Sequence, residues 1–418
     1  MKFNNALLKQ KKSEYFLGLD IGSEAIKSII FQRVILEKEK TEKIIIWGKS
    51  LEYFDKSDVF NIKDLEENIV KNTILESIKG TYQSFIQNIG RKSGIKMNSL
   101  PTLVSLPPSI LKERVIIQIF ERENGSTIIS KKEEADIYQK VLKKIKNEIE
   151  EYFSQKFGIL QEDVQFLSFT ISEIKIDGYN VLNLEGFKGK NVYLKIVVAF
   201  SLKEYLKNIE KILKDLKINF KKFISKEQNI PNLFIYEGND AIILDVGGDV
   251  SQIFLVKKGK TESVLEFESG GLDFTKKLSK VLGLNLEDAR NLKHNYSDLA
   301  LSEDVRKKLN EIFTEEVRNW FSDFKKALEI MSEKQKILFP SRIFIFGGGS
   351  LLPEIQEVLE EGDWEGLALV SKPEVKIIYP KDLKNIEDRT RGLISIQDVG
   401  LILACLSSYK ENYLIFEK

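Results

Sequence analysis

Apolar residues follow two patterns along the chain. Short apolar runs bounded by Asp, Gly or charged residues predict strands, and longer stretches with apolar residues at helical spacing predict helices. Strands are expected at 16–20, 26–31, around Val104, and at 115–120, 166–176, 192–200, 241–245, 251–256 and 342–346. Helices are expected at 65–89, 130–153, 201–216 and 302–331. Strands alternating with helices predict an α/β fold.

Two of the expected helices begin with a capping-box pattern. Ser130 is followed three residues later by Glu133, and Ser201 by Glu204. In this pattern the serine side chain accepts a hydrogen bond from the backbone of the third residue, whose own side chain reaches back. Both serines are therefore predicted to be N-caps.

One strand–turn–strand pattern occurs twice. In each copy an apolar run ends at an aspartate, Asp20 or Asp245, followed by an aliphatic residue, a glycine and a second apolar run. The two aspartates are 225 residues apart (245 minus 20). An internal repeat of this kind predicts two related halves.

Composition excludes several classes of function. The chain has 418 residues, enough for two or three domains, and 64 basic against 63 acidic residues, so no net charge attracts nucleic acid. Its one histidine, His294, and one cysteine, Cys405, are too few for a His- or Cys-ligated zinc site, a Cys–His pair or a disulfide framework. With no signal peptide or membrane span in the pattern, a cytoplasmic protein is expected.

The two repeated hairpins are the candidate phosphate site. Neither a Walker loop nor a dinucleotide-binding glycine pattern occurs. Tight glycine turns can present backbone N–H groups to phosphate oxygens, and an aspartate at each strand end can hold magnesium through its waters. A third element fits the same ligand, because the apolar run 342–346 ends in Gly347-Gly348-Gly349-Ser350 and lets backbone approach a flat group closely.

Together these three segments carry a family resemblance. The segments 18–23, 244–248 and 346–350 resemble the phosphate-1, phosphate-2 and adenosine motifs of the actin-like ATPase superfamily. Within it the chain is similar to the bacterial cell-division FtsA and pilus-assembly PilM families, also at 270–275, 282–293 and 176–189. The resemblance covers residue 15 to about residue 409.

The resemblance implies an α/β, actin-like (ribonuclease-H-like, duplicated) fold with a small inserted α+β subdomain. The implied units are a flexible tail (1–14), the first half of domain I (15–100), the inserted subdomain (101–190), the rest of domain I (191–237), domain II (238–399) and a C-terminal helix returning to domain I (400–418). The amphipathic membrane helix that ends FtsA is not expected here.

The resemblance also implies ATP and Mg²⁺ as ligands. Asp20 and Asp245 would be the catalytic residues and would hold the metal through water. The implied nucleotide-binding residues are Gly22, Ser23, Gly247, Gly248, Ser251, Gly270, Gly271, Lys293, Gly348, Gly349 and Ser350.

Four positions depart from the family pattern. Glu24 and Asp249 add a carboxylate to each phosphate loop, Val250 removes a hydroxyl, and Arg290 stands where the family often has Glu. Like charges close together weaken a polyphosphate site. The sequence therefore leaves open whether ATP is bound or hydrolysed, and predicts at most a slow ATPase.

The implied function is an actin-like ATP-binding scaffold that links cytoplasmic partners to a membrane-associated machine, of cell division or of type IV pilus assembly. Its partners would be proteins, reached through short peptides. Self-association is left open, nucleic acid is not expected, and the membrane would be reached only indirectly, at its inner face. The alternative is a pseudo-ATPase adaptor that binds peptides with a decayed nucleotide site; a sugar or acetate kinase on the same fold is a weaker third.

Overall fold

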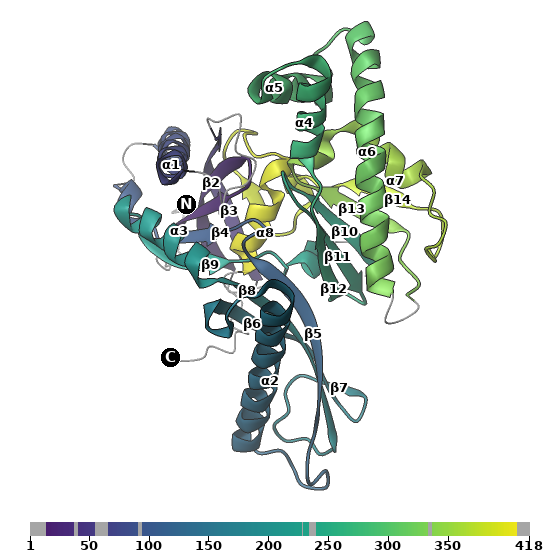
Figure 1. Cartoon of the computed structure of the whole chain (residues 1–418). Helices are drawn as coiled ribbons and strands as arrows, with labels where there is room; N and C mark the ends of the chain where they lie inside the picture. Colours follow the sequence, from purple (N-terminus) through teal and green to yellow (C-terminus); the bar gives the residue numbers. More distant parts are fainter. Residues whose placement is uncertain are drawn as a thin grey trace, which may run out of the picture.

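The computed structural model describes residues 14–36, 41–54, 66–90, 94–227, 229–233, 240–332 and 337–407 (Figure 1). Three parts of the sequence predictions lie outside the described residues: 1–13 of the expected tail, residue 65 of the expected helix 65–89, and 408–418 of the expected C-terminal helix.

Two sheets, whose strand orders match apart from one additional strand in the first, form the centre of the molecule (Figure 1). The first sheet has the order β15-β3-β2-β1-β4-β9 and the second the order β12-β11-β10-β13-β14. The strands of the first are β1 (Glu14–Ile21), β2 (Ala25–Leu36), β3 (Thr41–Tyr53), β4 (Thr102–Ser105), β9 (Phe220–Ile224) and β15 (Ile386–Asp388). Those of the second are β10 (Ala241–Val246), β11 (Ser251–Lys257), β12 (Lys260–Phe267), β13 (Arg342–Phe346) and β14 (Glu374–Ile377).

If the strands of each half are numbered along the chain and β15 is left out, both sheets have the order 3-2-1-4-5. In both, the first three strands form an antiparallel meander, and the fourth strand pairs in parallel with the first. The duplication predicted from the repeated hairpin is thus confirmed. We call the half built on the first sheet domain I and the half built on the second domain II.

Helices cover the outer faces of both sheets. In domain I, α1 (Glu67–Ile89) and α3 (Lys203–Asp215) share an apolar core with the sheet. In domain II the covering helices are α4 (Gly271–Leu282), α5 (Leu286–Ser297), α6 (Glu303–Ser332) and α7 (Pro353–Glu361). No helix in the described ranges combines the length and the apolarity that crossing a membrane requires.

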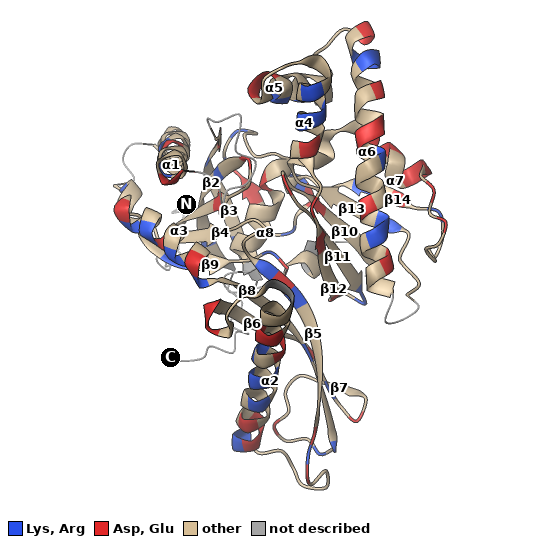
Figure 2. Cartoon of the chain, viewed as in Figure 1, with Lys and Arg blue, Asp and Glu red and all other residues tan. Residues whose placement is uncertain are grey.

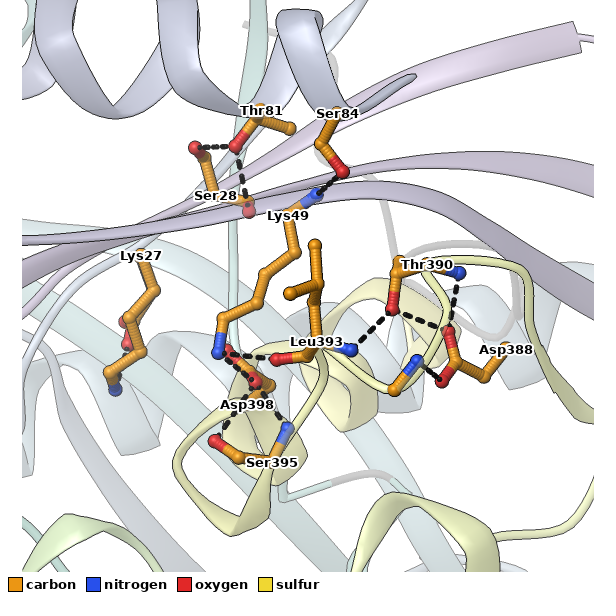
Figure 3. A network of polar contacts seen from close by, with 12 residues as sticks. Lys27, Ser28, Lys49, Thr81, Ser84, Asp388, Thr390, Leu393, Ser395 and Asp398 are labelled. Carbon is orange, nitrogen blue, oxygen red and sulfur yellow. Dashed lines mark hydrogen bonds and ion pairs between the residues drawn. The ribbon is translucent and has the colours of Figure 1, made fainter. Parts of the chain in front are cut away.

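The last described helix, α8 (Val399–Ser407), lies between the two sheets (Figure 1). Its apolar side chains share one core with the inner faces of both sheets, and it contacts β1, β4 and β9. A polar network holds the chain just before it (Figure 3). The Lys49 ammonium of β3 lies 2.8 Å from the buried Asp398 carboxylate and donates to the Leu393 carbonyl at 3.0 Å. Residues 399–407 therefore pack between the two halves.

A third unit, which we call the insert, has its own four-stranded sheet. The sheet has the order β5-β8-β6-β7, and α2 (Lys131–Phe157) packs on one face. Its strands are β5 (Lys112–Glu121), β6 (Val164–Ile176), β7 (Tyr179–Val181) and β8 (Asn191–Leu202). Val104, which the sequence suggested as a strand of this unit, instead lies in β4 of domain I, because it pairs with Leu19 of β1.

The insert contacts domain II as well as domain I. Lys195 of β8 is buried and its ammonium lies 2.6 Å from the Glu262 carboxylate of β12. Arg114 of β5 donates through both terminal nitrogens to the Glu266 carboxylate, at 2.6 and 2.8 Å. Paired guanidinium bonds of this kind fix the orientation of both groups. The insert is therefore attached to both halves.

The two predicted capping boxes have different outcomes. The Ser130 hydroxyl accepts from the Glu133 backbone at 3.2 Å and caps α2, although the Glu133 carboxylate binds Arg122 rather than turning back. The Ser201 prediction is wrong. Its hydroxyl donates to the Ile110 carbonyl at 2.8 Å, and α3 begins only after β8 ends at Leu202.

Candidate functional site

Three turns meet between the two halves of the molecule. Because β1 is parallel to β4 and β10 to β13, the turns that follow these strands lie at matching edges. The same tight turn occurs in both copies of the repeat: the Gly22 amide donates to the Ala25 carbonyl at 2.9 Å, and the Gly247 amide to the Val250 carbonyl at 3.2 Å. A Cβ at either glycine would lie within 2.8 Å of that carbonyl oxygen, so the close approach requires glycine.

These turns enclose a cleft of about 110 Å³, which is smaller than the roughly 300–1,000 Å³ of most small-molecule sites. The phosphate-1 and phosphate-2 turns touch across it, because the Asp249 amide donates to the Ser23 hydroxyl at 3.2 Å. Of the residues predicted from sequence, those lining the cleft are Asp20, Gly22, Ser23, Asp245, Gly247, Gly248, Lys293, Gly348 and Gly349.

Two predicted serines face away from the cleft. Ser251 is fully buried; its hydroxyl donates to the Ser269 carbonyl at 2.6 Å and accepts from the Trp320 indole N–H at 2.9 Å. The Ser350 hydroxyl donates to the Gly347 carbonyl at 2.7 Å, within its own turn. Both hydroxyls therefore serve the fold of domain II.

Two predicted glycines support the phosphate-2 turn from behind. The Gly271 amide donates to the Gly247 carbonyl, and the next amide donates to the Gly248 carbonyl, both at 2.8 Å. A Cβ on Gly270 would lie 2.6 Å from both of these carbonyl oxygens. Gly270 and Gly271 thus let the start of α4 pack directly against the turn, and they do not line the cleft.

Lys293 borders the cleft but its ammonium is already engaged. The buried Nζ donates to the Gly271 carbonyl and to the Thr275 hydroxyl, both at 2.6 Å, which ties α5 to α4. Burial lowers the pKa of this ammonium. The side chain therefore fixes the wall of the cleft, and two of its three N–H donors are already used.

Several cleft residues were not predicted from the sequence. Those with polar or charged side chains include Lys27, Tyr53, Lys226, His294 and Gln397. Lys27 is the cross-strand partner of Asp20 in the β1–β2 hairpin, so strand register could have identified it. Lys226 follows β9 in the connection between the halves, and no local pattern marks it.

Both aspartates expected to hold magnesium are ion-paired with lysine. The Lys27 ammonium donates to Asp20 at 2.8 Å, and the Lys226 ammonium donates to Asp245. Burial lowers the pKa of each lysine, but the attraction of the aspartates outweighs it, so both pKa values lie above their usual range. Each ion pair occupies Oδ2 of its aspartate, and the ammonium charge beside that oxygen would repel a divalent cation. This donor set does not fit the magnesium site that the resemblance implies.

Two departures from the family pattern neutralise each other. The Arg290 Nε lies 3.7 Å from the Glu24 carboxylate, and its guanidinium lies 4.6 Å from the centre of the Tyr53 ring. The added acid of the phosphate-1 turn thus has a cation and an aromatic ring beside it. For Asp249, burial raises the pKa against the lowering effect of the Ser23 hydrogen bond.

Removal of Arg290 is expected to destabilise the protein because it leaves Glu24 largely buried beside Asp249 without its counter-charge. We expect Arg290→Met to lower the free energy of unfolding by about 1–2 kcal/mol, less than a fully buried pair would cost, since both side chains retain some exposure. In urea unfolding, the double variant Glu24→Gln/Arg290→Met should recover part of this loss. Additive effects of the two single changes would show that the residues do not interact.

Comparison with known proteins gives two kinds of match. The cell division protein FtsA of Streptococcus pneumoniae is 20% identical over 372 residues, which cover 83% of this chain and 73% of that protein. FtsA of Enterococcus faecalis is 21% identical over 376 residues, covering 84% and 77%. No protein-family model matches the chain.

Among solved structures, a chain of a PilM–PilN type IV pilus biogenesis complex has the same fold. It superposes with a TM-score of 0.62 at 14% identity and covers 94% of this chain and 98% of its own. The duplicated sheets and the inserted subdomain indicate the same relationship as the sequence similarity to FtsA, which extends along most of the chain. The chain thus has the actin-like fold, and it is similar to FtsA in sequence and to PilM in structure.

Proposed function

We propose that this protein is a nucleotide-dependent scaffold whose two halves close around an adenine nucleotide and thereby change a surface that protein partners recognise. The observation that carries the proposal is the meeting of three glycine turns, two of them copies of one hairpin, at a cleft that also holds lysine ammonium groups. Backbone amides and ammonium groups together suit phosphate oxygens. Closure around a ligand can act as a switch without fast turnover.

The partners are proposed to be proteins of a membrane-associated machine, of cell division or of type IV pilus assembly, reached through short peptides from the cytoplasmic side. FtsA relatives are cell division proteins, and the pilus relative is part of a complex with PilN. Charged positions of both signs are interspersed along α2 and α6 in Figure 2, which argues against a nucleic-acid partner.

Thermal melting tests the nucleotide proposal. ATP at 100 times its dissociation constant should stabilise the protein by about 2.7 kcal/mol, seen as a higher melting temperature. The matched variant is Gly348→Phe, because a Cβ at Gly348 meets nothing closer than Gln397 at 3.7 Å and its ring would occupy the cleft. This variant should melt like the parent without ATP and lose the shift.

A parent protein whose melting temperature does not change at millimolar ATP, in buffers with magnesium and in buffers with a chelator, would contradict nucleotide binding. The peptide-binding adaptor with a decayed nucleotide site would then be the better description.

A further inference from the structure

The cation beside Asp245 comes from the opposite half of the molecule. In the first hairpin, Asp20 has Lys27 opposite it in the strand register, and the two form an ion pair. In the second hairpin the corresponding partner of Asp245 is Gln252, which is uncharged. The ammonium at Asp245 is instead supplied by Lys226, two residues after β9 of domain I ends.

Lys226 therefore gives Asp245 of domain II the same kind of counter-charge that Lys27 gives Asp20 of domain I. Each carboxylate has one ammonium in contact, and each lysine is also attracted by the aspartate of the other half. All four side chains are largely buried, with no more than about a fifth of any one exposed. The result is a group of two acids and two bases, without net charge, among the residues that line the cleft.

The chemistry of this group favours a phosphate ligand over a divalent cation. An ammonium carries three N–H donors, and the aspartate contact uses one of them at each lysine. The other donors can be shared with phosphate oxygens, as can the amides of the glycine turns. A divalent cation held by these two aspartates would instead lie beside two positive charges.

We propose that the cleft binds the polyphosphate of its nucleotide without a divalent cation, and that Lys226 supplies the positive charge on the Asp245 side. The inference rests on the proposed nucleotide binding and adds the ionic form of the ligand: free ATP rather than its magnesium complex. Because Lys226 also joins the two halves, the same side chain would couple phosphate binding to closure of the cleft.

Calorimetric titration of the full chain with ATP tests this, once with excess EDTA and once with millimolar magnesium. We expect the dissociation constant of the parent protein to be the same within about twofold in EDTA, or lower there. Lys226→Met should weaken binding in EDTA at least tenfold, whereas Lys226→Arg, which keeps the charge, should retain most of the affinity. Lys221→Met, which removes an exposed lysine five residues earlier, is the matched control and should bind like the parent.

Each result decides one question. Binding by the parent only in magnesium would overturn metal independence and leave the nucleotide proposal intact. Equal binding by Lys226→Met and the parent in EDTA would overturn the role of Lys226. Melting of Lys226→Met beside the parent shows whether a loss of binding comes from a folding defect instead. Failure of the parent to bind ATP under both conditions would overturn the nucleotide proposal itself, and this inference with it.

Discussion

Replacement of Trp320 by alanine is expected to lower the free energy of unfolding by about 3–5 kcal/mol, the range for removal of a large buried aromatic ring. Trp320 on α6 is fully buried, packs against Phe267 of β12 and Phe324, and donates its indole N–H to Ser251 of β11. The ring thus joins the longest helix of domain II to two of its strands. Urea unfolding followed by circular dichroism measures the loss.

Two matched variants show how much of the lost stability comes from the removed ring volume and how much from the central position of Trp320. Trp320→Phe keeps most of the ring, and Ser251 can still donate to the Ser269 carbonyl, so its loss should be less than half that of the alanine variant. Trp364→Ala removes a tryptophan from the partly exposed edge of the same apolar cluster and should also cost less. A loss below about 1 kcal/mol for Trp320→Ala would contradict the central role of this ring.

Glu113→Gln is expected to change the pH dependence of stability. Glu113 of β5 is buried with 3% of its surface exposed; it accepts from the Gln252 amide at 2.9 Å and neighbours the buried Glu227. Burial, and then the negative charge of Glu227, raise its pKa well above the usual value, although Lys226 and Gln252 oppose the shift.

The sign of the effect follows from this shift. Between the unfolded pKa, near 4.3, and the higher folded pKa, the native state holds a proton that the unfolded state has lost. Stability from this group is therefore fully present below about pH 4 and falls as pH rises through the window, by at most about 1.4 kcal/mol per pH unit. The amide of Glu113→Gln does not ionise, so the variant should gain stability relative to the parent as pH rises.

Urea unfolding at pH 4.5, 6 and 7.5 measures this difference. Glu123→Gln, an exposed acid just beyond the same strand, is the matched control and should track the parent at every pH. A difference between Glu113→Gln and the parent that stays constant from pH 4.5 to 7.5 would show that Glu113 ionises normally.

The repeated hairpins could be predicted because the information is local. An apolar run that ends in Asp, followed by a glycine in a tight turn, sets Asp20 and Asp245 at strand ends, and parallel pairing then brings the turns to one edge. The same rules could have corrected Ser251. Gln252 lies opposite Asp245 and shares its face, so the preceding residue must point the other way, toward α6.

The features that the sequence did not predict depend on contacts between residues far apart in the chain. Nothing near Lys226 indicates that it reaches Asp245, and Glu24 and Arg290 look like two separate defects until the fold brings them together. The Ser201 cap failed for a similar reason, since β8 continues through this residue by pairing with β6. Sequence reasoning therefore identified the walls of the cleft but not the charges that neutralise one another inside it.

Because the insert is attached to both halves, a rotation between the halves would also act on the insert. Lys195 and Arg114 hold the insert to β12, while the chain enters and leaves it through domain I. Any rotation between the halves must therefore break these ion pairs or swing the insert. The 27 residues of α2, at about 1.5 Å each, form an arm of about 40 Å, so each degree of rotation at its base would move its tip by about 0.7 Å. A small rotation at the cleft would thereby produce a larger displacement at the far end of the insert.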